Sequence, residues 1–212
     1  MSRLRLAFFV SGNGTLFESI AARCRSGELN AEPALLISSS AKAPALERAR
    51  WLDVPTAVMR RADFSSDEAF SDAMLAALSE HHVNFVCLAG YLKLVPAAVV
   101  AAFRHRMLNI HPALLPAFGG QGMYGHRVHE AVIEYGARIS GATVHMVDDQ
   151  YDHGPIVLQR AVFVRPDDTA DTLAERVHEI EHDLYVEAVR LFADNRIEMK
   201  ERHIRILPGT RE

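Results

Sequence analysis

The sequence of 212 residues has few cysteines, one tryptophan and no long apolar run. Its two cysteines, Cys24 and Cys87, are far apart and lie in apolar surroundings, where thiols serve as small core residues. No run approaches the roughly 18 apolar residues that a membrane-spanning helix needs. These absences argue against a disulfide framework and a membrane anchor, and we expect a reduced protein of the cytoplasm.

An excess of basic charge is also missing. The chain has 23 Lys and Arg against 27 Asp and Glu, a net charge of -4, which argues against a general nucleic-acid binder. The first residues, MSRLRLAFFVSGNG, combine basic residues with a short apolar run. Because that run ends in Gly-Asn-Gly instead of a small-residue cleavage site, we expect a buried first strand and no signal peptide.

Short apolar runs alternate with amphipathic stretches along the chain. This alternation predicts an α/β fold with a doubly wound, mainly parallel sheet and helices on both faces. A long C-terminal helix is expected to begin near Asp168 or Thr169. No linker divides the chain, so we expect a single domain over residues 1–212. The predicted strands are 6–10, 34–38, 85–89, 107–110, 142–147 and 155–164, and the predicted helices are 16–24, 45–52, 66–82 and 129–136.

A glycine-containing loop, VSGNGTLFES, follows the first predicted strand at residues 10–19. Backbone N–H groups from Gly12 to Thr15, at the start of a helix, would make a seat for an anion such as phosphate. The loop lacks the Lys-Ser/Thr pair of nucleoside-triphosphate loops and the third glycine of a dinucleotide fingerprint. A tight strand-to-helix turn without a ligand is the alternative.

The segment LNIHPALLPAFGG, residues 108–120, places an amide and an imidazole two residues apart. Pro112 keeps His111 out of the helical region, so the segment is expected to be extended. Residues two apart on an extended chain point to the same side, and Asn109 and His111 would therefore face one space. They would form either a decorated turn or the donors that stabilise an oxyanion during attack on a carbonyl.

A second polar segment, TVHMVDDQYDHGP, places His145, Asp148, Asp149 and Asp152 around a strand end. A carboxylate beside His111 would favour the protonated imidazole and raise its pKa. The same carboxylate would help to remove a proton from an attacking amine. An acidic turn without catalytic use is the alternative.

The stretch HEIEH at residues 178–182 matches the zinc-peptidase pattern through His178, Glu179 and His182, and the reversed pattern through Glu181. A third ligand would have to come from elsewhere, such as His126, His129 or Asp152. Such a short pattern arises easily in a chain with eleven histidines. We favour a polar helix face and expect no metal.

Four segments together, SGNGT, LAGYLKLVP, NIHPALLPAF and TVHMVDDQYDHGP, resemble the folate-dependent formyltransferases from the first strand to about residue 194. With the glycine loop, the resemblance implies formyl transfer from 10-formyltetrahydrofolate to the amine of glycinamide ribonucleotide, in purine synthesis. It implies a phosphate-binding, Rossmann-like half at residues 1–100, a catalytic and folate-binding half at 101–195 and a C-terminal tail at 196–212. The chain would be a monomer or a homodimer.

The resemblance also implies roles for individual residues. Asn109, His111 and Asp152 would be catalytic, with His111 as the general acid, and Glu181 would contact the ribose or the amine of the ribonucleotide. The substrate phosphate would be held by the loop of Gly12, Asn13, Gly14, Thr15 and Leu16. The folate would contact Leu92, Lys93, Leu94, Val95, Asn109, Val147 and Asp149.

Three positions depart from the family pattern: Leu16 replaces a usual Asn, and Lys93 and Asp67 stand where relatives commonly carry Arg. Lys93 cannot reproduce a planar, bidentate guanidinium contact. The main competing function is 10-formyltetrahydrofolate hydrolysis, with water in place of the amine. A zinc hydrolase using HEIEH and an inactive folate- or nucleotide-binding protein are two further hypotheses, each from a different class of protein.

Overall fold

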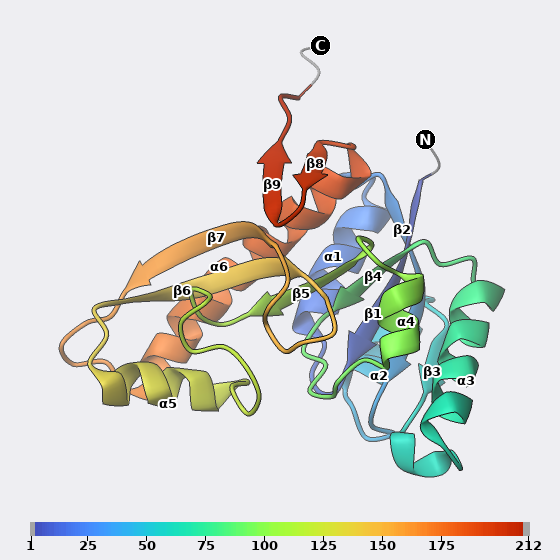
Figure 1. Ribbon diagram of the computed structural model, residues 1–212, viewed down its shortest axis with the longest axis horizontal. Helices are drawn as coiled ribbons and strands as arrows, with labels where there is room; N and C mark the ends of the chain where they lie inside the picture. The colour runs from blue at the N-terminus through green and yellow to red at the C-terminus, as the bar shows by residue number, and fades with distance from the viewer. Residues whose placement is uncertain (1–2, 210–212) are drawn as a thin grey trace. The chain divides into compact units, whose positions relative to one another are not determined.

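The computed structural model describes residues 3–209 and contains the predicted α/β elements (Figure 1). Within these residues the main sheet has seven strands in the order β3-β2-β1-β4-β5-β6-β7, and β8 and β9 form a separate pair. The predicted fold class is confirmed. The strands are β1 (Leu4–Val10), β2 (Ala31–Ser38), β3 (Thr56–Val58), β4 (Phe85–Leu88), β5 (Met107–His111), β6 (Ile139–Met146), β7 (Ile156–Phe163), β8 (Ile197–Lys200) and β9 (His203–Ile206). The helices are α1 (Thr15–Arg25), α2 (Ala45–Trp51), α3 (Asp67–Glu80), α4 (Ala97–Ala102), α5 (His126–Tyr135) and α6 (Ala170–Ala193), with a 3-10 turn, η1, at Arg61–Asp63.

The chain divides into two compact units, one ending at Leu108 and the other beginning at Asn109. In the first unit, β1 pairs in parallel with both β2 and β4, and β2 pairs in parallel with β3. The β1 residues from Leu6 to Val10 have no exposed surface, as expected for a parallel strand covered on both faces. The ring of Phe17 on α1 packs edge-on against Phe8, with ring centroids 4.9 Å apart.

The second unit is built on an antiparallel pair of strands and a long helix. Strands β6 and β7 form the antiparallel pair, and α6 lies along both of them and contacts α5 (Figure 1). Thr169 caps α6, because its side chain accepts from the Thr172 amide while the Thr172 side chain accepts from the Thr169 amide. The predicted start of the long helix is therefore confirmed.

The C-terminal hairpin is the main element that the sequence did not predict. Strands β8 and β9 pair antiparallel over four residues each and are joined by Glu201 and Arg202. Strands this short give little periodic signal, and none of the residues of β8 and β9 is fully buried. They occupy the segment expected to be a tail at 196–212, of which residues 210–212 lie outside the described part. The predicted single domain over 1–212, with its halves, stays a prediction.

Both cysteines lie in the core of the first unit. Cys24 and Cys87 are buried and form no disulfide, and burial raises the pKa of the Cys24 thiol to about 11, which makes it an unreactive core residue. Between residues 3 and 209, none of the helices has both the length and the apolar content needed to cross a membrane.

Candidate active site

Asn109 and His111 lie at the carboxyl end of β5 and open the second unit. The extended backbone of this strand places both side chains on one side, as the sequence predicts. The His111 ring is almost completely buried, with 3% of its side chain exposed. Asn109 is half-buried. The strand therefore delivers an amide and an imidazole to one sheltered place.

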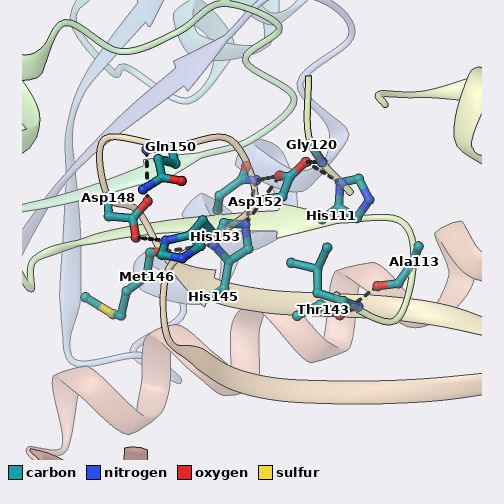
Figure 2. A network of polar contacts seen from close by, with 12 residues as sticks. His111, Ala113, Gly120, Thr143, His145, Met146, Asp148, Gln150, Asp152 and His153 are labelled. Atoms are coloured by element: carbon teal, nitrogen blue, oxygen red, sulfur yellow. Dashed lines mark hydrogen bonds and ion pairs between the residues drawn. The ribbon is translucent and has the colours of Figure 1, made fainter. Parts of the chain in front are cut away.

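Asp152 reaches these side chains from the loop between β6 and β7 (Figure 2). Its Oδ2 lies 3.4 Å from His111 Nδ1 and accepts a 2.9 Å hydrogen bond from the Gly120 amide. Its Oδ1 lies 3.5 Å from Asn109 Nδ2. The structure thus brings together the three residues predicted to be catalytic, although they are separated by up to 43 positions along the chain.

His145 completes the group, although the sequence predicted no role for it. Its buried ring donates from Nδ1 to the Met146 carbonyl at 2.7 Å, so Nε2 carries a lone pair. That Nε2 accepts from Asn109 Nδ2 at 3.1 Å and lies 3.6 Å from Asp152 Oδ1. His145 therefore orients the Asn109 amide. The sequence feature that could have indicated this role is a histidine within the largely apolar residues of β6.

The second ring nitrogen of His111 is also engaged. Nε2 lies 2.8 Å from the Phe118 carbonyl oxygen and must donate to it, because a carbonyl only accepts. The opposite nitrogen, Nδ1, is the one that faces Asp152. In this arrangement a proton added to Nδ1 is stabilised directly by the carboxylate.

The predicted rise in the His111 pKa is wrong in its net direction. Burial lowers the pKa of His111 and outweighs the Asp152 carboxylate and the Phe118 carbonyl, which both raise it. The sequence revealed the carboxylate but not the depth of burial. Burial would raise the pKa of Asp152, but the groups around the carboxylate, among them the Gly120 amide that donates to Oδ2, outweigh burial and lower the pKa. The pair thus consists of a neutral imidazole and an ionised carboxylate near pH 7.

The glycines after Phe118 shape the loop around Asp152. A Cβ atom on Gly119 would lie 2.5 Å from Leu115 Cδ2 and 3.2 Å from Asp152 Cβ, so no other residue fits without displacing one of them. The next amide, that of Gly120, is the donor to Asp152 Oδ2. The close approach of backbone to carboxylate therefore depends on glycine at position 119.

Glu181 of α6 is buried on the same unit, with 9% exposure. Its Oε2 accepts from His178 Nδ1 at 3.0 Å. Burial lowers the pKa of both His111 and His129, and the Glu181 carboxylate opposes this shift without reversing it. The Nδ1 atom of the buried His129 has no hydrogen-bond partner among the described residues. Glu181 thus adds negative charge close to the catalytic group, and its contact with the ribonucleotide stays a prediction.

The HEIEH stretch forms part of α6 and does not assemble a zinc-peptidase ligand set. His178 and His182 lie on one helix face with their Nε2 atoms 3.2 Å apart, and Glu179 is exposed. In the part of the chain that the structure describes, no three His, Cys, Asp or Glu side chains are grouped so as to hold a metal ion. His126, one of the suggested third ligands, instead contacts Glu130 and Asp171.

The predicted phosphate loop belongs to the first unit and is built from backbone. Gly14 caps α1 in the left-handed region, with φ +73°, and a Cβ there would lie 2.5 Å from Ala45 Cβ. The Arg48 side chain stabilises the loop, because its Nε donates to the Asn13 carbonyl at 2.9 Å. The first amides of the helix, from Thr15 onwards, form a positive helix end suited to an anion. Leu16 is 8% exposed, so its side chain belongs to the core.

The predicted folate segment, residues 92–95, exposes apolar surface. Leu92 and Leu94 are about half exposed, at 50% and 52%, whereas Val95 is buried. The Leu92 amide donates to Ser11 Oγ at 2.9 Å, which fixes the start of the segment. Exposed leucines on a fixed turn favour an apolar ligand surface. In the second unit Val147 is half-buried and Asp149 exposed, and the folate contacts of all these residues stay predictions.

A buried imidazole, a carboxylate and an amide converge at a strand end, an arrangement suited to an enzyme that activates a carbonyl group and moves a proton. The comparison with known families identifies which carbonyl chemistry this is. A family model described as formyl transferase matches residues 4–189, and the chain belongs to this family.

Individual relatives agree with that assignment. A phosphoribosylglycinamide formyltransferase from Arabidopsis thaliana, described as chloroplastic, is 46% identical over 94% of this chain and 68% of its own length. The phosphoribosylglycinamide formyltransferase of Bacillus subtilis is 34% identical over 88% of this chain and 93% of its own. The crystal structure of glycinamide ribonucleotide transformylase 1 from Symbiobacterium toebii, at 40% identity, superposes with a TM-score of 0.92 over 98% of this chain and 95% of that one.

Proposed function

We propose that this chain transfers the formyl group of 10-formyltetrahydrofolate to the amine of glycinamide ribonucleotide, giving N-formylglycinamide ribonucleotide in de novo purine synthesis. The observation that carries the proposal is the convergence of Asn109, His111 and Asp152 in one buried group. The names of the three relatives described above, two phosphoribosylglycinamide formyltransferases and a glycinamide ribonucleotide transformylase, support the choice of substrate.

The proton balance of the reaction suits the ionisation of this pair. Transfer of a formyl group between two nitrogens moves one proton from the attacking amine to the nitrogen that leaves, and consumes none. Because burial lowers its pKa, His111 is neutral and able to accept the amine proton. Asp152 then stabilises the imidazolium until the same proton is returned to the leaving nitrogen. We propose this base-then-acid role in place of a general acid alone.

Asn109 supplies the remaining chemistry, stabilisation of the developing oxyanion. One N–H of its amide is held by His145, which sets the plane of the group. The other N–H points toward Asp152 over a long 3.5 Å contact and is available to a stronger acceptor. A donor held in place before the charge develops contributes more to the rate than one that must reorient.

Substrate recognition is divided between the two units, each taken by itself. In the first unit, we assign the 5′-phosphate to the backbone amides of Gly14, Thr15 and Leu16, because they lie at the start of α1, where the helix end favours an anion. The exposed surface of residues 92–95 is assigned to the pterin. In the second unit, we assign the ribose or amine to Glu181, and further folate contacts to Asn109, Val147 and Asp149.

Hydrolysis of 10-formyltetrahydrofolate is the reaction to distinguish, because the same three residues suit attack by water. The purified chain is incubated with the folate in the presence and absence of glycinamide ribonucleotide, and both the folate and the formylated ribonucleotide are quantified. We expect folate release that requires the ribonucleotide and matches product mole for mole. Release at the same rate without the ribonucleotide would assign the chain to the hydrolases.

We further propose that the reaction needs neither a metal ion nor a nucleic-acid or membrane partner, that the chain acts as a monomer or homodimer, and that it works in the cytoplasm. The plant relative is described as chloroplastic, so the compartment differs among relatives. Treatment with a chelator is expected to leave the transfer rate unchanged. Stoichiometric zinc that is lost together with activity in His182→Ala would restore the zinc-hydrolase hypothesis.

A further inference from the structure

The catalytic loop between β6 and β7 needs support to hold Asp152 where it is. Its ends are closed by a 2.8 Å hydrogen bond from the Met146 amide to the Pro155 carbonyl. Gly154 lies so close to the Met146 carbonyl that a Cβ would be 1.9 Å from that oxygen. Between these fixed points, Asp152 adopts the left-handed region with φ +52°, which is unfavourable for a residue with a side chain. Such a conformation persists only when neighbouring contacts enforce it.

A chain of contacts supplies such enforcement, and Figure 2 shows the part of it formed by Asp148, Gln150 and His153. Asp148 accepts from the Gln150 amide at 3.0 Å through Oδ1 and from His153 Nδ1 at 2.7 Å through Oδ2. Arg202 donates to the His153 carbonyl at 2.5 Å and lies 3.3 Å from His153 Nε2. His153 directly follows Asp152, so both its backbone and its ring are held next to the catalytic carboxylate.

The two ring nitrogens of His153 have partners of opposite kinds, a carboxylate and a guanidinium. Its Nδ1–H donates to the Asp148 carboxylate, which leaves Nε2 as the acceptor for the Arg202 guanidinium. Each contact between Arg202, His153 and Asp148 therefore joins a donor to an acceptor.

Arg202 comes from the tip of the C-terminal hairpin, beyond residue 189, where the match to the family model ends. The base of the hairpin is fastened to the end of α6. The Arg196 amide donates to the Leu191 carbonyl at 2.8 Å, and the Leu207 amide donates to the Arg196 carbonyl at 2.8 Å. The Arg196 side chain donates again to the Leu207 carbonyl, at 2.9 Å. The hairpin is therefore fixed at its base to the end of α6 and carries the Arg202 guanidinium at its tip.

We infer that Arg202, through His153, is a positioning residue that fixes the catalytic loop and with it Asp152; as a step in catalysis, this rests on the proposed function. A displacement of a reacting group by about 1 Å costs roughly a hundredfold in rate. Exposed ion pairs add little to global stability, so the effect falls on the placement of the loop.

The test compares Arg202→Met with Arg205→Met. Arg205 lies on the same hairpin, and its guanidinium pairs with Glu198 at 3.6 Å within that hairpin, so its loss removes an equal charge without touching the loop. For Arg202→Met we expect a fall of about tenfold in kcat, with the KM for the ribonucleotide and the midpoint of thermal unfolding unchanged. Arg205→Met is expected to retain the wild-type kcat, and Arg202→Lys to recover part of the loss.

Hydrogen exchange at residues 147–153 provides a readout that does not depend on activity. The Gln150 amide is expected to exchange faster in Arg202→Met than in Arg205→Met. A kcat within twofold of wild type, equal losses in the two variants or unchanged exchange would each overturn the inference. A wild-type chain that formylates no ribonucleotide would refute the proposed function, while the exchange result would still decide whether Arg202 holds the loop.

Discussion

The glycine loop of the first unit and the catalytic group of the second are built in different ways. The loop at residues 12–16 presents backbone amides, and its shape depends on one glycine, Gly14, for which no other residue fits. The catalytic group consists of side chains from three segments, β5, β6 and the loop carrying Asp152, and depends on mutual hydrogen bonds. Changes in the first should therefore act through conformation and stability, and changes in the second through rate.

The largest effect is expected from Asp152→Asn. The amide keeps the size of the carboxylate but no longer stabilises a proton on His111 Nδ1, so we expect kcat to fall by about a thousandfold or more, as for other orienting acids beside a catalytic histidine. Steady-state transfer assays measure the rate, and urea unfolding measures stability, which should change little. A loss no greater than that of Lys93→Met would remove Asp152 from the catalytic group.

A large effect on stability, and not on rate, is expected from Gly14→Ala. The left-handed backbone and the contact with Ala45 Cβ should lower the free energy of unfolding by about 2–4 kcal/mol. Gly12→Ala is the matched control, because nothing lies within 4 Å of a Cβ added there. Equal unfolding midpoints for the two variants in urea would show that the loop tolerates a side chain at position 14.

A smaller loss of rate is expected from His145→Ala. Without the Nε2 acceptor the Asn109 amide is free to rotate, and we expect kcat to fall by about ten- to a hundredfold. His145→Gln keeps an acceptor of similar reach and should recover part of the rate. If both variants retain the wild-type kcat, His145 has only a packing role.

The pH dependence follows from the lowered pKa values of His111 and Asp152. Both groups bind protons less readily in the folded than in the unfolded chain, so their contributions to stability are present above the unfolded values and are lost as pH falls. Activity should persist below pH 6.5 and then fall about tenfold per unit once His111 is protonated. An NMR titration of His111 should give a midpoint below 6.5, lower still in Asp152→Asn. A midpoint above 6.5 would contradict the base-then-acid role.

The smallest effect is expected from Lys93→Met. Lys93 is exposed, and a flexible ammonium forms no planar, bidentate contact, so we expect less than a fivefold rise in the KM for the folate. Lys93→Arg supplies a planar, bidentate guanidinium and is expected to lower that KM. A larger loss in Lys93→Met would mean that the ammonium itself binds the folate.

The sequence predicted the features that local patterns determine and missed those that depend on contacts between distant segments. The alternation of apolar runs sufficed for the sheet and for α6, and the spacing of Asn109 and His111 sufficed to place them together. The net direction of the His111 pKa depended on burial by distant segments, which no local pattern encodes. His145 gave a weak signal, since a single polar residue in a strand is more often a packing feature. Strands β8 and β9 were too short to predict.

The hydrogen bond from His111 Nε2 to the Phe118 carbonyl has a consequence for the empty enzyme. A buried N–H without an acceptor costs about 1–3 kcal/mol, and the chain avoids this cost by supplying a carbonyl of its own. A substrate carbonyl that accepts a hydrogen bond from His111 Nε2–H must first displace the Phe118 carbonyl. One hydrogen bond is then replaced by another of similar strength. The affinity for substrate must then come from contacts remote from the reacting carbonyl, and the imidazole can serve the reaction without adding to ground-state binding.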